Sequence, residues 1–147
     1  SKTSLDVSGI MKRKGGFFMY ESCIMRWEQN CLVAELSGEV DHHMAAAMRS
    51  VLDEEILDRG KGNGPVHLIF DFHHVTFMDS SGIGVVLGRY QKIRETGGRV
   101  CITGCDDYVK QILHMAGVFM IASYCGSLEE AIAKCLGKAE EPWTKME

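Results

Sequence analysis

The stretch 76-TFMDSSGIGVVLGRY-90 decides the fold, because it passes from a strand signal through a short polar loop into a helix signal. Its apolar residues recur three or four positions apart, as on the buried side of a helix over residues 81–95: Ile83, Val86, Leu87, Tyr90 and Ile93. Ser80 and Ser81 stand at the predicted helix start, where either hydroxyl can accept a backbone N–H and cap the helix.

The first turns of this helix contain three residues without a side chain, Gly82, Gly84 and Gly88. Each glycine costs a helix about 1 kcal/mol relative to alanine, so something must approach the helix closely. The approaching surface is either the sheet beneath or another protein. A helix start can also accommodate a phosphoryl group, through its free N–H groups and dipole.

Upstream, the chain predicts a hairpin, a helix and a second strand. Residues 23–29 and 31–37 alternate in polarity about a turn at 29–30, and Gly38 ends the hairpin. Asp41 is the predicted N-cap of a helix over residues 42–57. The apolar run 66–72 predicts an inner strand, and residues 73–80 are expected to link it to the glycine-rich helix.

Downstream, strand and helix signals alternate once more. Strands are predicted at 99–103 and 119–123, and helices from Asp106 or Asp107 to Ala116 and from the Ser127 cap to Leu136. The fold class is therefore α/β, with a mixed sheet opened by a β-hairpin and continued by right-handed βαβ units whose helices pack on the sheet.

Length and composition indicate one ordinary globular domain. The 147 residues are 46% hydrophobic and 24% charged, with a net charge of -4, which disfavours a general nucleic-acid or anionic-membrane binder. No apolar run approaches the ~18 residues of a membrane span, so we expect a cytoplasmic protein. Residues 1–21 are expected to be an N-terminal extension or an expression remnant, partly disordered. Residues 22–137 are the predicted domain, and 138–147 a tail.

Enzymatic and metal signatures are absent from the sequence. The six cysteines show no C-x-x-C spacing and are expected to be reduced and structural. The adjacent pairs His42-His43 and His73-His74 do not match metal-ligand spacing, and no phosphate-binding loop or nucleophile elbow occurs. Asp71 at a strand end permits a response-regulator receiver, but the opening hairpin disfavours it. We therefore predict no catalytic residue, cofactor or metal.

Four segments carry a family resemblance: GEVDHH at 38–43, VTFMDSSGIGVVLGRY at 75–90, GG at 97–98 and MAGVF at 115–119. Together they resemble the STAS domains of bacterial anti-anti-sigma factors, in the branch that controls sporulation. The resemblance covers residues 22–137 in order and implies the STAS fold.

The resemblance also implies a function. Such proteins bind an anti-sigma factor that is also a serine kinase, and so release a sigma factor for transcription. The kinase phosphorylates the first serine of the DSSG motif, here Ser80, and a protein serine phosphatase removes the phosphate. Asp41 matches a family aspartate near the partner. The remaining residues expected at the partner site are Asp79, Ser81, Gly82 and Gly84.

Three alternatives remain open from the sequence. One is a STAS scaffold component of a stress-signalling complex, and another is the tail of a transporter. The third is an enzyme, either a nucleotide hydrolase or a thiol enzyme that uses Cys105 or Cys125.

Overall fold

A computed structural model describes residues 12–14, 17–20, 22–62 and 64–137. The described strands form one sheet whose spatial order follows the chain from β1 to β7. The first four strands pair antiparallel and β4 to β7 pair parallel. The elements are β1 (Lys12–Lys14), β2 (Phe17–Tyr20), β3 (Cys23–Glu28), β4 (Cys31–Val40), α1 (His42–Gly60), β5 (His67–Met78), α2 (Ser80–Glu95), β6 (Val100–Thr103), α3 (Asp107–Met115), η1 (Val118–Met120), β7 (Ser123–Cys125) and α4 (Leu128–Cys135).

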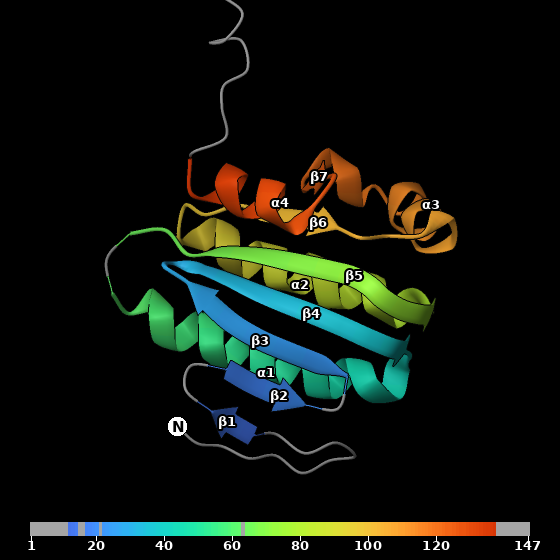
Figure 1. Ribbon diagram of the computed structural model, residues 1–147, viewed down its shortest axis with the longest axis horizontal. Coiled ribbons are helices and arrows are strands. Elements are labelled where there is room, and N and C mark those ends of the chain that lie inside the picture. The colour runs from blue at the N-terminus through green and yellow to red at the C-terminus, as the bar shows by residue number, and fades with distance from the viewer. Residues whose placement is uncertain (1–11, 15–16, 21, 63, 138–147) are drawn as a thin grey trace, which may run out of the picture.

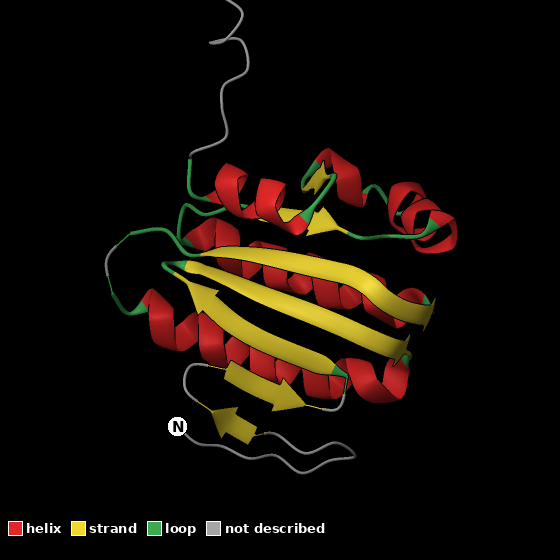
Figure 2. Cartoon of the chain, in the orientation of Figure 1, coloured by secondary structure: helices red, strands yellow, loops and turns green. Residues whose placement is uncertain are grey.

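The sheet lies between two unequal helical layers. Helices α1 and α2 pack behind it and α4 lies in front, as Figure 1 shows, and Figure 2 shows the strands between them. Alternate side chains of β4 pack on opposite faces of the sheet. Leu32, Ala34 and Leu36 belong to the main core, and Val33 belongs to the smaller core under α4. The predicted α/β class, with an opening hairpin and covering helices, is confirmed.

Strands β4 and β5 run further than the sequence pattern predicts. The predicted end of β4 at Gly38 is wrong, because the strand bends there with a φ of 75° and continues to Val40. The predicted linker at 73–80 is likewise wrong, because β5 continues to Met78. Each extension is the hydrogen-bonding partner of the other, ending in the pair Val40 and Met78. Pairing between neighbouring strands thus outweighs the polar composition of the local sequence.

Two further differences concern short elements. The strand predicted at 119–123 is wrong: the chain forms the 3₁₀ turn η1 and places β7 at Ser123–Cys125. Strands β1 and β2 lie within residues 1–21, where no strand is predicted, and lengthen the hairpin into a meander. The rest of that segment, and the tail 138–147, lie outside the described residues.

An ion pair between the buried Arg89 and the half-exposed Asp53 joins α1 to α2. Arg89 is only 5% exposed, and its Nε lies 2.8 Å from Asp53 Oδ1. Burial lowers the pKa of this guanidinium, while Asp53 acts in the opposite direction and favours its charge. No residue pattern marks Arg89 as buried, because arginine on a helix is usually exposed. The pair sets the position of one helix relative to the other.

Four cysteines line the small core between the sheet and α4: Cys31, Cys101, Cys125 and Cys135. The Cys101 and Cys135 sulfurs lie 3.5 Å apart as free thiols. Burial raises the pKa of Cys125 to about 12, so this thiol stays protonated and unreactive near neutral pH. The described part of the chain holds no group of side chains that could bind a metal ion. Within it, too, no helix is long and apolar enough to cross a bilayer.

We expect all six cysteines to titrate as free thiols in denaturant, without prior reduction. In the folded protein Cys105 should react first, because it alone among the six is partly exposed. Counting thiols with a chromogenic disulfide reagent, with and without denaturant, measures both. Fewer than six in freshly purified, reductant-free protein would contradict a structural role for the cysteines.

Candidate functional site

The site lies at the edge of the sheet where β4 and β5 end together. Val40 and Met78 are the last pair of these parallel strands, and Asp41 and Asp79 follow them directly. The Asp79 N–H donates to the Val40 carbonyl over 3.3 Å. Helices α1 and α2 therefore begin side by side, and the predicted site residues Asp41, Asp79 and Ser80 are brought together.

Asp79, rather than either serine, caps α2. Its Oδ1 accepts the Ser81 N–H over 2.8 Å, so the prediction that Ser80 or Ser81 is the cap is wrong. Aspartate and serine are comparable N-caps, which is why the sequence alone does not separate them. Ser80 is left as the first residue of the helix and is exposed, whereas Ser81 is half-buried. The Ser80 hydroxyl is thus not needed to start the helix.

Asp41 is the N-cap of α1, as predicted. Its Oδ1 accepts the Met44 N–H over 3.0 Å, and this bond above all lowers the pKa of the carboxyl group. A third aspartate, Asp106, caps α3 through the Val109 N–H at 2.9 Å. Carboxylates therefore cap the starts of α1, α2 and α3, where the helix dipole favours a negative charge.

The glycines of α2 fall into two kinds. Gly82 is buried, and a Cβ there would collide with the Met78 side chain, so this glycine lets the first turn rest on the sheet. Gly84 and Gly88 have open space where a Cβ would be. Gly82, predicted to contact a partner, therefore has a packing role, and only Gly84 of the predicted pair is exposed.

A phosphoryl group on Ser80 would meet little compensation from α2. The N–H groups of Ser81 and Gly82 already donate to the side chain and the carbonyl of Asp79. The added charge of about -1.5 to -2 would lie beside the Asp79 carboxylate. The helix start therefore offers such a group fewer N–H donors than the sequence predicts.

An aromatic pair beside the site is missed by the sequence analysis. The rings of Phe77 and Tyr108 stack with centroids 6.4 Å apart, and both side chains are exposed. The Tyr108 hydroxyl donates to the Met78 carbonyl over 3.0 Å, which fixes α3 beside Ser80. Only the apolar face of α3 is predicted from its periodicity, whereas Tyr108 lies on the exposed face. The available signal was an aromatic residue at the edge of the core-facing stripe, one turn before Ile112.

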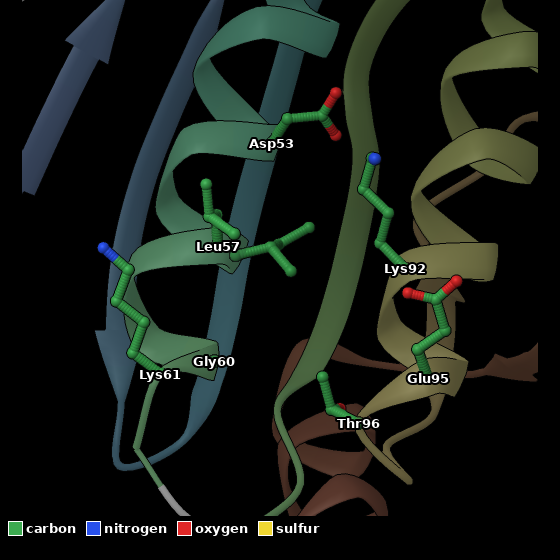
Figure 3. Close-up of a pocket in the computed structure, with 8 residues that line it drawn as sticks. Asp53, Leu57, Gly60, Lys61, Lys92, Glu95 and Thr96 are labelled. Atoms are coloured by element: carbon green, nitrogen blue, oxygen red, sulfur yellow. The ribbon is translucent and has the colours of Figure 1, made fainter.

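A hollow of about 300 Å³ lies between the last turns of α1 and α2. Figure 3 shows Leu57 and Lys92 at its walls, with the Lys92 side chain pointing toward Asp53. It lies at the far end of α2 from Ser80, and this helix of 16 residues spans ~24 Å. The hollow is therefore separate from the edge that carries Asp41, Asp79 and Ser80.

Comparisons with known proteins agree with this geometry. The model of the STAS domain matches residues 23–131. An anti-sigma F factor antagonist of Paenibacillus polymyxa is 37% identical over 97 residues, which are 66% of this chain and 80% of that protein. The anti-sigma factor antagonist SpoIIAA in its unphosphorylated form is a structural neighbour with a TM-score of 0.69 and 27% identity, covering 81% of this chain and 100% of that one. The phosphorylated form of SpoIIAA from Bacillus has a TM-score of 0.62 and 26% identity, covering 77% and 98%.

Replacing the two glycines by alanine should have opposite effects on stability. Gly82→Ala should lower the free energy of unfolding by about 2 kcal/mol, because its Cβ overpacks Met78. Gly84→Ala should raise it by ~0.5–1 kcal/mol, because alanine loses less backbone entropy and finds open space. Urea unfolding measures both, and a destabilising Gly84→Ala would contradict this division.

The Asp41 cap should make stability sensitive to acid. Because the pKa of Asp41 is lowered in the folded state, the unfolded chain takes up the proton at a higher pH. The stabilising effect of the Asp41 cap is present above the usual aspartate pKa of about 3.9. This effect is lost as the pH falls through the lower pKa that Asp41 has in the folded protein. Asp41→Asn keeps a capping oxygen without titrating, so its melting temperature should fall less on acidification than that of the parent. Asp41→Ala should melt lower at every pH, and identical acid profiles for parent and Asp41→Asn would refute the assignment.

Proposed function

Because the chain belongs to the STAS domain family, we propose that it is an anti-sigma factor antagonist regulated at Ser80. In this proposal its domain, residues 22–137, binds an anti-sigma factor that is also a serine kinase and thereby frees a sigma factor for transcription. A protein serine phosphatase restores the active form. The protein acts in the cytoplasm by binding and not by catalysis, with no nucleic acid, membrane, cofactor or metal, and sporulation is the programme that we infer it serves.

The observation that carries this proposal is the position of Ser80. Its side chain is exposed at the first residue of α2, and Asp79 supplies the cap that a serine would otherwise provide. A kinase can therefore reach the hydroxyl without unwinding the helix. The structural neighbour SpoIIAA exists in phosphorylated and unphosphorylated forms, which supports modification of the same fold.

Phosphorylation would act on the partner more than on the fold. Ser80 projects away from the core, so the added charge leaves the packing of α2 on Met78 untouched. An anti-sigma factor seated on the same edge would have to desolvate that charge beside Asp79. A loss of about 3 kcal/mol at an interface weakens binding more than a hundredfold, which operates a switch without a conformational change.

The neighbouring residues have separate roles in this proposal. Asp41 and Asp79 each cap the start of their own helix and present carboxylates to the partner. Ser81 serves the helix start, and Gly84 leaves room for the partner to approach α2 closely. Gly82 contributes indirectly, by allowing α2 to rest on the sheet.

The decisive experiment uses the anti-sigma factor kinase encoded in the same genome. Ser80→Ala should bind it with unchanged affinity and take up no phosphate, because the acceptor hydroxyl is gone. Ser80→Asp should bind at least tenfold more weakly while keeping the circular dichroism and melting temperature of the parent. Intact mass after incubation with ATP, and isothermal titration calorimetry, measure these outcomes.

Ser81→Ala is the matched control and should still take up one phosphate at the parental rate. Uptake of a phosphate by Ser80→Ala would move the acceptor to Ser81. Equal affinity of Ser80→Asp and the parent would exclude the switch. Asp41→Asn, which keeps the cap, should bind more weakly, and unchanged binding would remove Asp41 from the partner site.

A further inference from the structure

Most of the large apolar side chains exposed among the described residues gather near one short helix. They are Phe77, Tyr108, Met115, Met120 and Ile121, and Leu57 is the exception at the far end of α1. Met115 and Met120 are 77% and 86% exposed, which is unusual for methionine. Such patches commonly mark a protein–protein contact. We call Phe77, Tyr108, Met115 and Met120 the α3 surface.

The α3 surface is continuous with the edge of the sheet that carries Asp41, Asp79 and Ser80, which we call the Ser80 edge. Phe77 precedes Ser80 by three residues and stacks on Tyr108, whose hydroxyl is bonded to the Met78 carbonyl. Tyr108 and Met115 are seven residues apart on α3 and so share one side of it. Turn η1, which carries Met120, packs against α3. Figure 1 shows α3 at the end of the sheet where β5 stops.

The Ser80 edge is too small to hold a partner by itself. Its exposed residues, such as Ser80 and Gly84, offer little side-chain area, whereas a stable interface buries about 800 Å² on each partner. A partner must therefore extend beyond the edge. The strands of the sheet offer the half-buried charged side chains Arg26, Glu35 and Asp71, and the first turns of α1 expose His42 and Ala46. Among the described residues, exposed aromatic and methionine side chains, which are enriched at protein interfaces, gather on the α3 surface.

We propose that the α3 surface is the apolar half of the interface with the anti-sigma factor, and that it supplies most of the binding energy while Ser80 controls it. This inference rests on the proposed function. It requires a matching apolar patch on the anti-sigma factor, next to the groups that cover Ser80. Phosphorylation then prevents close approach at one end of an interface whose attractive part lies at the other.

The test is the double substitution Met115→Gln with Met120→Gln, measured against the anti-sigma factor kinase of the same genome. Both side chains are exposed, so the melting temperature should not change, while affinity should fall at least tenfold. Leu57→Gln is the matched control, since Leu57 is 67% exposed but lies outside the α3 surface, and it should bind like the parent. The double variant should still be phosphorylated at Ser80 when kinase is in excess.

Three outcomes would overturn the inference. The double variant binding like the parent would exclude the α3 surface from the interface, even though Ser80→Asp still weakened binding and the proposed function stood. Equal weakening by Leu57→Gln would show a non-specific effect of lost apolar surface. A parent dimer that the double variant converts to a monomer in light scattering would assign the surface to a second copy of this chain. Failure of the parent itself to bind would instead refute the proposed function.

Discussion

The parallel pairing of β4 with β5 is the constraint on which the rest of the structure depends. Because both strands continue to the pair Val40 and Met78, they end side by side at the same edge of the sheet. Two aspartates then start two helices next to each other. Had β4 ended at Gly38, α1 would begin away from α2, and Asp41 would lie apart from Ser80. Strand register thus brings together residues that are about forty positions apart in the sequence.

The contacts between the helices keep that arrangement in place. Arg89 reaches across from the middle of α2 to Asp53, and Gly82 lets the first turn of α2 settle on Met78. Loss of the half-exposed Asp53 would leave the buried Arg89 guanidinium without its counter-charge, so the pair favours one relative position of the two helices. Arg89 and Gly82 both lie on α2, about two turns apart. Together they hold this helix, which begins with Ser80, in one orientation on the sheet.

Much of this could be predicted from the sequence, and what could not has physical causes. Periodicity identified α1, α2 and the two faces of β4, because the burial of apolar side chains dominates those elements. Chemistry at a helix start identified Asp41 as a cap, but for α2 it pointed to Ser80 or Ser81 instead of Asp79, because serine and aspartate are comparable N-caps. The length of β5 and the burial of Arg89 escaped prediction, because both depend on partners distant in the chain.

The separation between the cap and the exposed serine has a consequence for how this position can change. Since Asp79 caps the helix and the Ser80 side chain is exposed, we expect the folded domain to tolerate other residues at position 80. Under the proposed regulation at Ser80, natural selection can therefore change how that side chain behaves without a penalty in folding. In the proposed function, a permanently active or permanently silent form therefore lies one substitution away from the regulated one, with the same folded domain.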